Sequence, residues 1–86
     1  MNDHSVRQIL LDALHKVAGK PDPEQANRLR QPNNDTPITD LGLDSLEGIE
    51  WCMEIETLTG VELDPAELIA VGSFDNLVNL VVDRQR

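Results

Sequence analysis

One short stretch of the chain combines a carboxylate, a nucleophilic hydroxyl and a helix start: Gly42-Leu43-Asp44-Ser45-Leu46. Asp44 and Glu47 approximate a capping box, in which two side chains bind the first backbone N–H groups of a helix. Ser45 would then lie in the first helical turn, where unpaired N–H groups and the helix dipole attract anions. A phosphate ester on Ser45 would be stabilised there. The plainer interpretation is an ordinary helix start, because such capping signatures are common.

The sequence offers Ser45 no evident catalytic partner. A serine nucleophile needs an adjacent base that a third group orients, and His4 and His15 are separated from Ser45 by a long polar segment. The alternative is a hydrolase of the Gly-Asp-Ser-Leu type, because Asp44-Ser45-Leu46 superficially matches that motif. However, one residue separates Gly42 from Asp44, the Gly-x-Ser-x-Gly elbow is absent, and 86 residues are too few for an α/β-hydrolase sheet. We therefore expect a protein that is not an enzyme.

Length, charge and composition narrow the class of protein. We expect residues 1–86 to form one domain, which buries only roughly 60% of the surface of its unfolded chain. A formal net charge of −9, with one Trp, one Phe and no Tyr, argues against nucleic-acid binding. The single Cys52 forms neither an internal disulfide nor a metal site, and no apolar run could span a bilayer or act as a signal peptide. We expect a soluble, cytoplasmic monomer without metal.

The charges are unevenly distributed along the chain. Every Lys and Arg lies at or before Arg30 or after Asp83, whereas most of the acidic residues lie between these positions. Carboxylates in that interval therefore have no cation near them in the sequence. Such an arrangement can simply be a solvated face. It can also be a surface that attracts basic partners and speeds their encounter.

Apolar spacing and capping residues predict an all-α fold. Apolar side chains recur every three or four residues before Gly19, which is the pattern of an amphipathic helix with a glycine stop. The expected helices cover residues 3–18, 45–59 and 65 to about 70, and a last segment that Ser73 caps. Three main helices and one short one make a small four-helix bundle, with a long first loop and a short third helix.

The first loop, which lies between the helices expected at residues 3–18 and 45–59, is rich in proline and polar residues. Because loops of this length are uncommon in compact domains, we expect Pro23–Arg30 to form a short helix within it. Residues 31–37 carry turn-forming side chains throughout. We expect Ile38, Leu41 and Leu43 to pin the end of the loop to the core.

The helix expected at 45–59 has apolar side chains on two sides. One stripe, which we assign to the core, comprises Trp51, Cys52, Ile55 and Leu58. The other begins directly after Ser45 and is interleaved with carboxylates. We call this second set the contact strip; it comprises Leu46, Ile49 and Met53 with Glu47, Glu50 and Glu54. A helix apolar on two sides can be buried all round, but the carboxylates favour a strip that stays partly open to partners.

The segment Asp40–Glu47 resembles the attachment site of acyl carrier proteins, usually written D-x-G-x-D-S-L. The similarity continues downstream at Ile49, Glu50, Met53 and Glu54, and then at residues 61–65 and 71–74. It extends without a large gap from Pro37 to the C-terminus. The motif, the chain length, the acidity and the helix order all agree with this family.

The resemblance implies a carrier that catalyses nothing itself. A phosphopantetheinyl transferase would attach 4′-phosphopantetheine from coenzyme A to Ser45, beside Asp44. The thiol of the arm would then hold acyl groups as thioesters in fatty-acid or polyketide biosynthesis. Acyl-loading and acyl-processing enzymes with basic surfaces would read the contact strip. An aminoacyl or peptidyl carrier, and an unmodified acidic interaction module, are the alternatives.

Two residues bear on the type of carrier. Asp44 looks more like fatty-acid and polyketide carriers than like peptidyl carriers, which often have His before the serine. Trp51 departs from the aliphatic residue that the family usually has at its helix position. Together they indicate a specialised discrete carrier.

Overall fold

The structure is a computed structural model that describes residues 2–19, 22–31 and 36–85. These residues form five α-helices and one short 3-10 helix. The elements are α1 (Asp3–Ala18), α2 (Pro23–Leu29), η1 (Ile38–Leu41), α3 (Ser45–Thr59), α4 (Pro65–Val71) and α5 (Phe74–Arg84). The predicted all-α fold is confirmed, and the predicted bounds of α1 and α3 agree with the structure.

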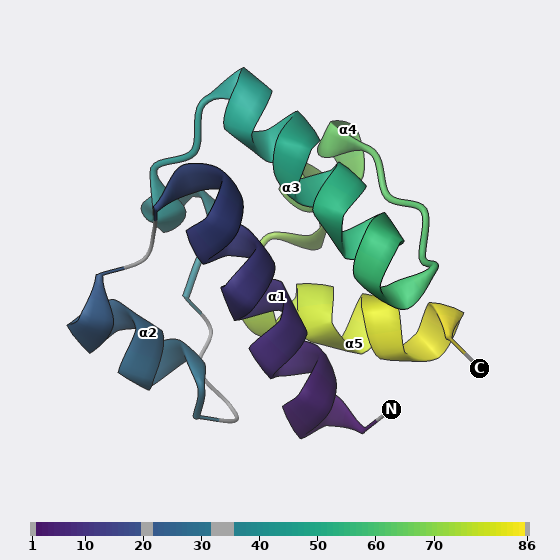
Figure 1. The fold of residues 1–86 in the computed structure, drawn as a ribbon, viewed down its shortest axis with the longest axis horizontal. Helices are drawn as coiled ribbons and strands as arrows, with labels where there is room; N and C mark the ends of the chain where they lie inside the picture. The colour runs from purple at the N-terminus through teal and green to yellow at the C-terminus, as the bar shows by residue number, and fades with distance from the viewer. Residues whose placement is uncertain (1, 20–21, 32–35, 86) are drawn as a thin grey trace.

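The helices α1, α3 and α5 make the body of the bundle. Figure 1 shows α1 packed beside both α3 and α5, with α2 set apart on the other side of α1. The short helix α4 lies behind α3 in this view and also contacts α5 and η1. The predicted four-helix bundle is therefore α1, α3, α4 and α5, and α2 is an addition within the long first loop.

Side-chain caps fix where the later helices begin. Asp64 Oδ1 accepts the N–H of Glu67 at 2.9 Å, and Pro65 occupies the first position of α4. Ser73 Oγ accepts the N–H of Asn76 at 3.2 Å and starts α5. These contacts satisfy donors that have no partner inside the helix, and both caps agree with the sequence prediction.

The first loop contains the predicted short helix. α2 ends at Leu29, one residue earlier than predicted, with Arg30 as its C-cap. Leu29 is fully buried and anchors α2 to the bundle. Of the turn predicted at 31–37, residues 32–35 lie outside the described part of the chain.

The end of the first loop is tied to the segment between α4 and α5. Its three predicted anchors are Ile38 and Leu41, which are buried, and Leu43, which is half-buried against the core. Two backbone hydrogen bonds add to them. The Ile38 N–H donates to the Gly72 carbonyl, and the Phe74 N–H donates to the Thr36 carbonyl, both at 2.9 Å. This pairing fixes η1, and with it the approach of the chain to α3.

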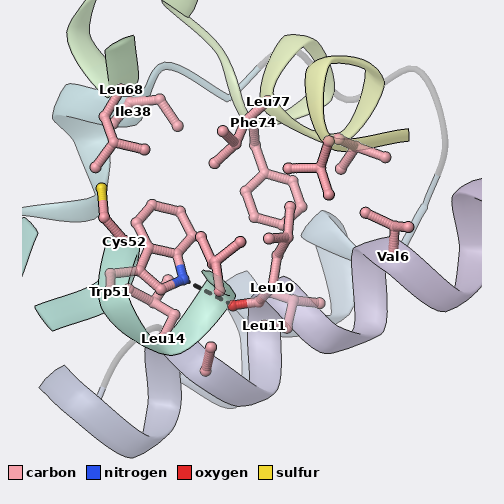
Figure 2. Close-up of a cluster of buried hydrophobic side chains, with 14 of the residues drawn as sticks. Val6, Leu10, Leu11, Leu14, Ile38, Trp51, Cys52, Leu68, Phe74 and Leu77 are labelled. Atoms are coloured by element: carbon pink, nitrogen blue, oxygen red, sulfur yellow. Dashed lines mark hydrogen bonds between the residues drawn. The ribbon is translucent and has the colours of Figure 1, made fainter. Parts of the chain in front are cut away.

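Trp51 lies at the centre of the core. Its side chain is fully buried, and its indole N–H donates to the Leu10 carbonyl of α1 at 3.0 Å (Figure 2). The bond satisfies the one polar group that a buried tryptophan brings into a core. It also fixes α3 against α1, because both partners belong to regular helices.

The core stripe predicted for α3 is confirmed at three of its four positions. Trp51, Cys52 and Ile55 are buried, but Leu58 is 44% exposed, so its assignment to the core is wrong. Leu58 lies in the last turn of α3. There the chain turns back, and Val61 of the following connection is buried in the core instead.

Arg7 is a buried charged residue that joins three helices. Its Nη1 donates to the Leu29 carbonyl at 3.0 Å, and its Nη2 forms an ion pair with Asp75 Oδ1 at 2.7 Å. The guanidinium also lies over the Phe74 ring, 5.6 Å from the ring centroid. α1 is thereby connected to α2 and to the start of α5. Periodicity did not predict this, because arginine on an amphipathic helix ordinarily faces solvent.

We expect Arg7→Met to lower the free energy of unfolding by roughly 3–5 kcal/mol, because the carboxyl group of Asp75 would lose its partner in a largely buried place. The double variant Arg7→Met, Asp75→Leu should regain most of that loss, since apolar residues often replace a buried ion pair without penalty. Urea unfolding followed by circular dichroism measures both values. A double variant no more stable than Arg7→Met would show that the ion pair is not what matters there.

Candidate functional site

Ser45 is the first residue of α3, and its side chain is exposed. Asp44 caps the helix: its Oδ1 accepts the N–H of Glu47 at 2.7 Å, and Glu47 Oε1 accepts the N–H of Asp44 at 3.1 Å. The predicted capping box is therefore confirmed in both halves. Because the cap occupies the N–H of Glu47, the N–H groups of Ser45 and Leu46 are the ones directed outward from the helix start.

The backbone conformation of Gly42 explains why the motif has a glycine at this position. It ends η1 with φ 68° and ψ 32°, in the left-handed region, and its N–H donates to the Thr39 carbonyl at 3.3 Å. Residues with a side chain are strained in this conformation. Glycine thus lets the chain leave η1 and reach the cap of α3 within two residues.

A pocket of about 330 Å³ opens beside Ser45, between η1, α3 and α4. Most of the side chains around it are apolar. The lining comprises Ile38, Thr39, Leu43, Asp44, Ser45, Gly48, Ile49, Pro65, Leu68 and Ile69. This pocket was not predicted from the sequence. One available signal was the adjacent apolar pair Leu68-Ile69, of which Leu68 is buried and Ile69 is 75% exposed beside the pocket.

Gly48 keeps part of this pocket open. It is buried within α3, where glycine costs about 1 kcal/mol relative to alanine. A Cβ at this position would meet Leu68 Cδ1 at 4.0 Å, an ordinary contact, so the packing of the helices does not itself require glycine. Because Gly48 lines the pocket, a longer side chain there would occupy it.

The contact strip lies on the exposed side of α3 that follows Ser45. Its apolar side chains are Leu46, Ile49 and Met53, which are 63%, 43% and 62% exposed. The two-sided pattern predicted for α3, with one buried stripe and one open stripe, is thereby confirmed. Ile49 belongs both to the strip and to the pocket lining, so the strip reaches the mouth of the pocket.

The acidic interval of the sequence is partly neutralised by cations that are remote in the chain. These cations lie outside the interval, as the sequence shows, and the fold brings them close to three of its carboxylates. The pairs are Glu54 with Lys16 at 3.0 Å, Asp75 with Arg7 at 2.7 Å, and Glu67 with Arg84. Lys16 is largely exposed, so its ion pair with Glu54 of the contact strip contributes little to stability.

Cys52 lies on the core side of α3 near the pocket. Figure 2 shows its sulfur directed toward the side chain of Leu68, which lines the pocket. Burial raises the pKa of Cys52 to about 11, and the negative charges of Asp64 and Glu67 add to the effect. The thiol therefore stays protonated at neutral pH, and a protonated thiol is a poor nucleophile.

Nowhere in residues 2–19, 22–31 and 36–85 do three His, Cys, Asp or Glu side chains gather as metal ligands. None of the described helices has the length and apolar character needed to cross a membrane.

The chain belongs to the phosphopantetheine attachment site family, whose model matches residues 5–81. No curated protein and no solved structure gave a match. Members of this family are carrier proteins without catalytic activity, and 4′-phosphopantetheine is attached to them covalently. They interact with a phosphopantetheinyl transferase and with partner enzymes. The protein is therefore a phosphopantetheine-dependent carrier and not an enzyme, as the motif predicted.

Proposed function

We propose that Ser45 carries the phosphopantetheine arm and that the cargo is an acyl group. The observation that carries the proposal is the position of Ser45, exposed at the start of α3 and beside an apolar pocket. A transferase can reach an exposed hydroxyl. The N–H groups of Ser45 and Leu46 and the helix dipole would stabilise the negative charge of the phosphodiester. The residues present thus fit the group.

The residues around Ser45 have separate roles in this proposal. Asp44 and Glu47 hold the first turn of α3 in place, so that the hydroxyl and the outward N–H groups keep one geometry. The arm, when attached, supplies the thiol that holds cargo as a thioester. Transfer of the cargo is left to partner enzymes. The family match spans most of the chain, which supports one carrier domain over residues 1–86.

The pocket favours an acyl cargo over an aminoacyl one. Its volume of about 330 Å³ is at the lower end of the roughly 300–1,000 Å³ that ligand pockets occupy, which suits a short apolar chain. Burying methylene groups there is favourable by about 0.8 kcal/mol each. The ammonium group of an aminoacyl cargo would instead lose its hydration against apolar walls, which is costly.

The contact strip is the surface that we assign to partner enzymes. It combines exposed apolar side chains, of which Ile49 lies at the mouth of the pocket, with the carboxylates Glu47, Glu50 and Glu54. Ile69 of α4 extends the apolar surface on the other side of the pocket. Apolar anchors within a charged rim are typical of transient interfaces, and the carboxylates would steer basic partners toward Ser45.

Modification of Ser45 can be measured directly. Wild-type protein, incubated with coenzyme A and a broad-specificity phosphopantetheinyl transferase, should gain the mass of one phosphopantetheine, and Ser45→Ala should gain none. Ser5→Ala, which alters an exposed serine of α1, is the matched control and should be modified like the wild type. Intact-protein mass spectrometry reads all three. An unmodified wild type, tested with several transferases, would favour the acidic interaction module instead.

Reversal of charge on the contact strip should slow the same reaction. We expect Glu50→Lys to lower the rate of modification several-fold at low salt, because steering by opposite charges raises association rates. The difference should shrink in 1 M NaCl, where the screening length is about 3 Å. Glu24→Lys makes the same change on α2 and should have a much smaller effect. Equal rates for both variants and the wild type would leave the strip as a solvated surface.

Cargo binding in the pocket should protect a thioester. On the wild-type carrier, hydroxylamine should cleave an octanoyl thioester roughly tenfold more slowly than an acetyl thioester, each relative to the same thioester of free pantetheine. Burying about two methylene groups of the octanoyl chain contributes about 1.6 kcal/mol, which corresponds to the roughly tenfold difference in cleavage rate. Gly48→Leu should abolish the protection by filling the pocket, whereas Gly48→Ala should keep most of it. Equal relative rates in the wild type would argue against an acyl pocket.

A further inference from the structure

α4 is the least securely packed wall of the pocket. Of its seven residues, all of which the structure describes, only Leu68 is buried. A helix this short is not stable alone, because nucleation is costly and few hydrogen bonds follow. Its position therefore depends on the contacts that other elements make with it.

Side chains of α5 bind α4 near both of its ends. Near the first turn, Arg84 Nη1 donates to the Glu62 carbonyl at 3.0 Å, and Arg84 Nη2 is hydrogen-bonded to Glu67 Oε2. At the other end, Asn76 Nδ2 donates to the Val71 carbonyl at 2.8 Å. The residues of α4 that line the pocket are Pro65, Leu68 and Ile69. Glu67 directly precedes Leu68 in the chain, so Arg84 binds α4 next to residues that form the pocket wall.

The contact of Arg84 is more specific than its place in the sequence suggests. A cation in the last turn of a helix is ordinarily explained by the helix dipole, and α5 ends at this residue. The guanidinium is nevertheless bonded to two acceptors of another segment, an arrangement that its rigid fork of donors favours and that lysine cannot reproduce. The bond from Arg84 also lowers the pKa of Glu67, so the carboxylate is charged at neutral pH.

We propose that Arg84 is a positioning residue that holds α4 against the pocket and so determines how well the pocket shelters an acyl chain. The inference rests on the proposed function of the pocket. The pair between Arg84 and Glu67 is partly exposed, and exposed pairs contribute little to global stability. Its loss is therefore expected to loosen α4 while the core around Trp51 stays folded. α4 would then move away from the pocket more often, and the acyl chain of the cargo would spend more time in solvent.

The first measurement is amide hydrogen exchange on the unmodified protein. Exchange in α4 should become several-fold faster in Arg84→Met, and exchange in α1 and α3 should not change. Arg28→Met removes the same charge from α2, which lines no part of the pocket, and should behave like the wild type. Glu67→Gln is a second variant. Glutamine can preserve the capping box with Asp64, so faster exchange there would point to the contact with Arg84.

The second measurement is thioester cleavage by hydroxylamine on the loaded carrier. Arg84→Met should lose most of the roughly tenfold octanoyl protection, while the acetyl thioester is cleaved as in the wild type. Arg84→Lys should regain only part of the protection. A role limited to global stability would instead also speed amide exchange in α1 and α3, which the first measurement reports. If Arg84→Met unfolds, Glu67→Gln takes its place in both measurements.

The outcomes separate the two proposals. Unchanged exchange in α4 overturns the role of Arg84, and so does faster exchange in α4 with full octanoyl protection. A wild type that does not protect octanoyl overturns the acyl pocket, and the inference with it. Exchange in α4 still reports in that case whether Arg84 holds the helix, so the two failures cannot be confused.

Discussion

A buried guanidinium joins three helices of this small bundle, in addition to the apolar core that they share. Arg7 reaches from α1 to the last residue of α2 and to Asp75 in the first turn of α5. The start of α5 is in turn bonded to the end of the first loop, through the Phe74 N–H and the Thr36 carbonyl. That loop leads through η1 to the capped first turn of α3. A continuous series of contacts thus leads from Arg7 to the segment that precedes Ser45.

The elements that could be predicted from the sequence are those whose signals are local. The bounds of α3 follow from Asp44, Glu47 and Gly60, all within or next to the helix, and the structure agrees. Burial along α3 follows from spacing alone, apart from Leu58 at its end. Ser45 itself was singled out by a motif of adjacent residues, not by any feature of the packed structure.

What could not be predicted depends on pairs that are distant in the sequence. Arg7 and Arg84 each bind groups about twenty residues away or more, and periodicity contains no information on such partners. The pocket is a further case, because its walls come from three separate elements and only their packing brings them together. The sequence therefore suggested Ser45 as the site of attachment but did not suggest the pocket beside it. That pocket is the feature on which the proposed acyl cargo depends.

The chemistry of Cys52 has a consequence for the fidelity of the carrier. Exchange of an acyl group between two thiols is nearly neutral in free energy, so at equilibrium a second thiol close to an acyl cargo would hold a share of it. With a pKa of about 11, only roughly one Cys52 in ten thousand is ionised at pH 7. Misloading is thus suppressed by the rate of the reaction and not by its equilibrium.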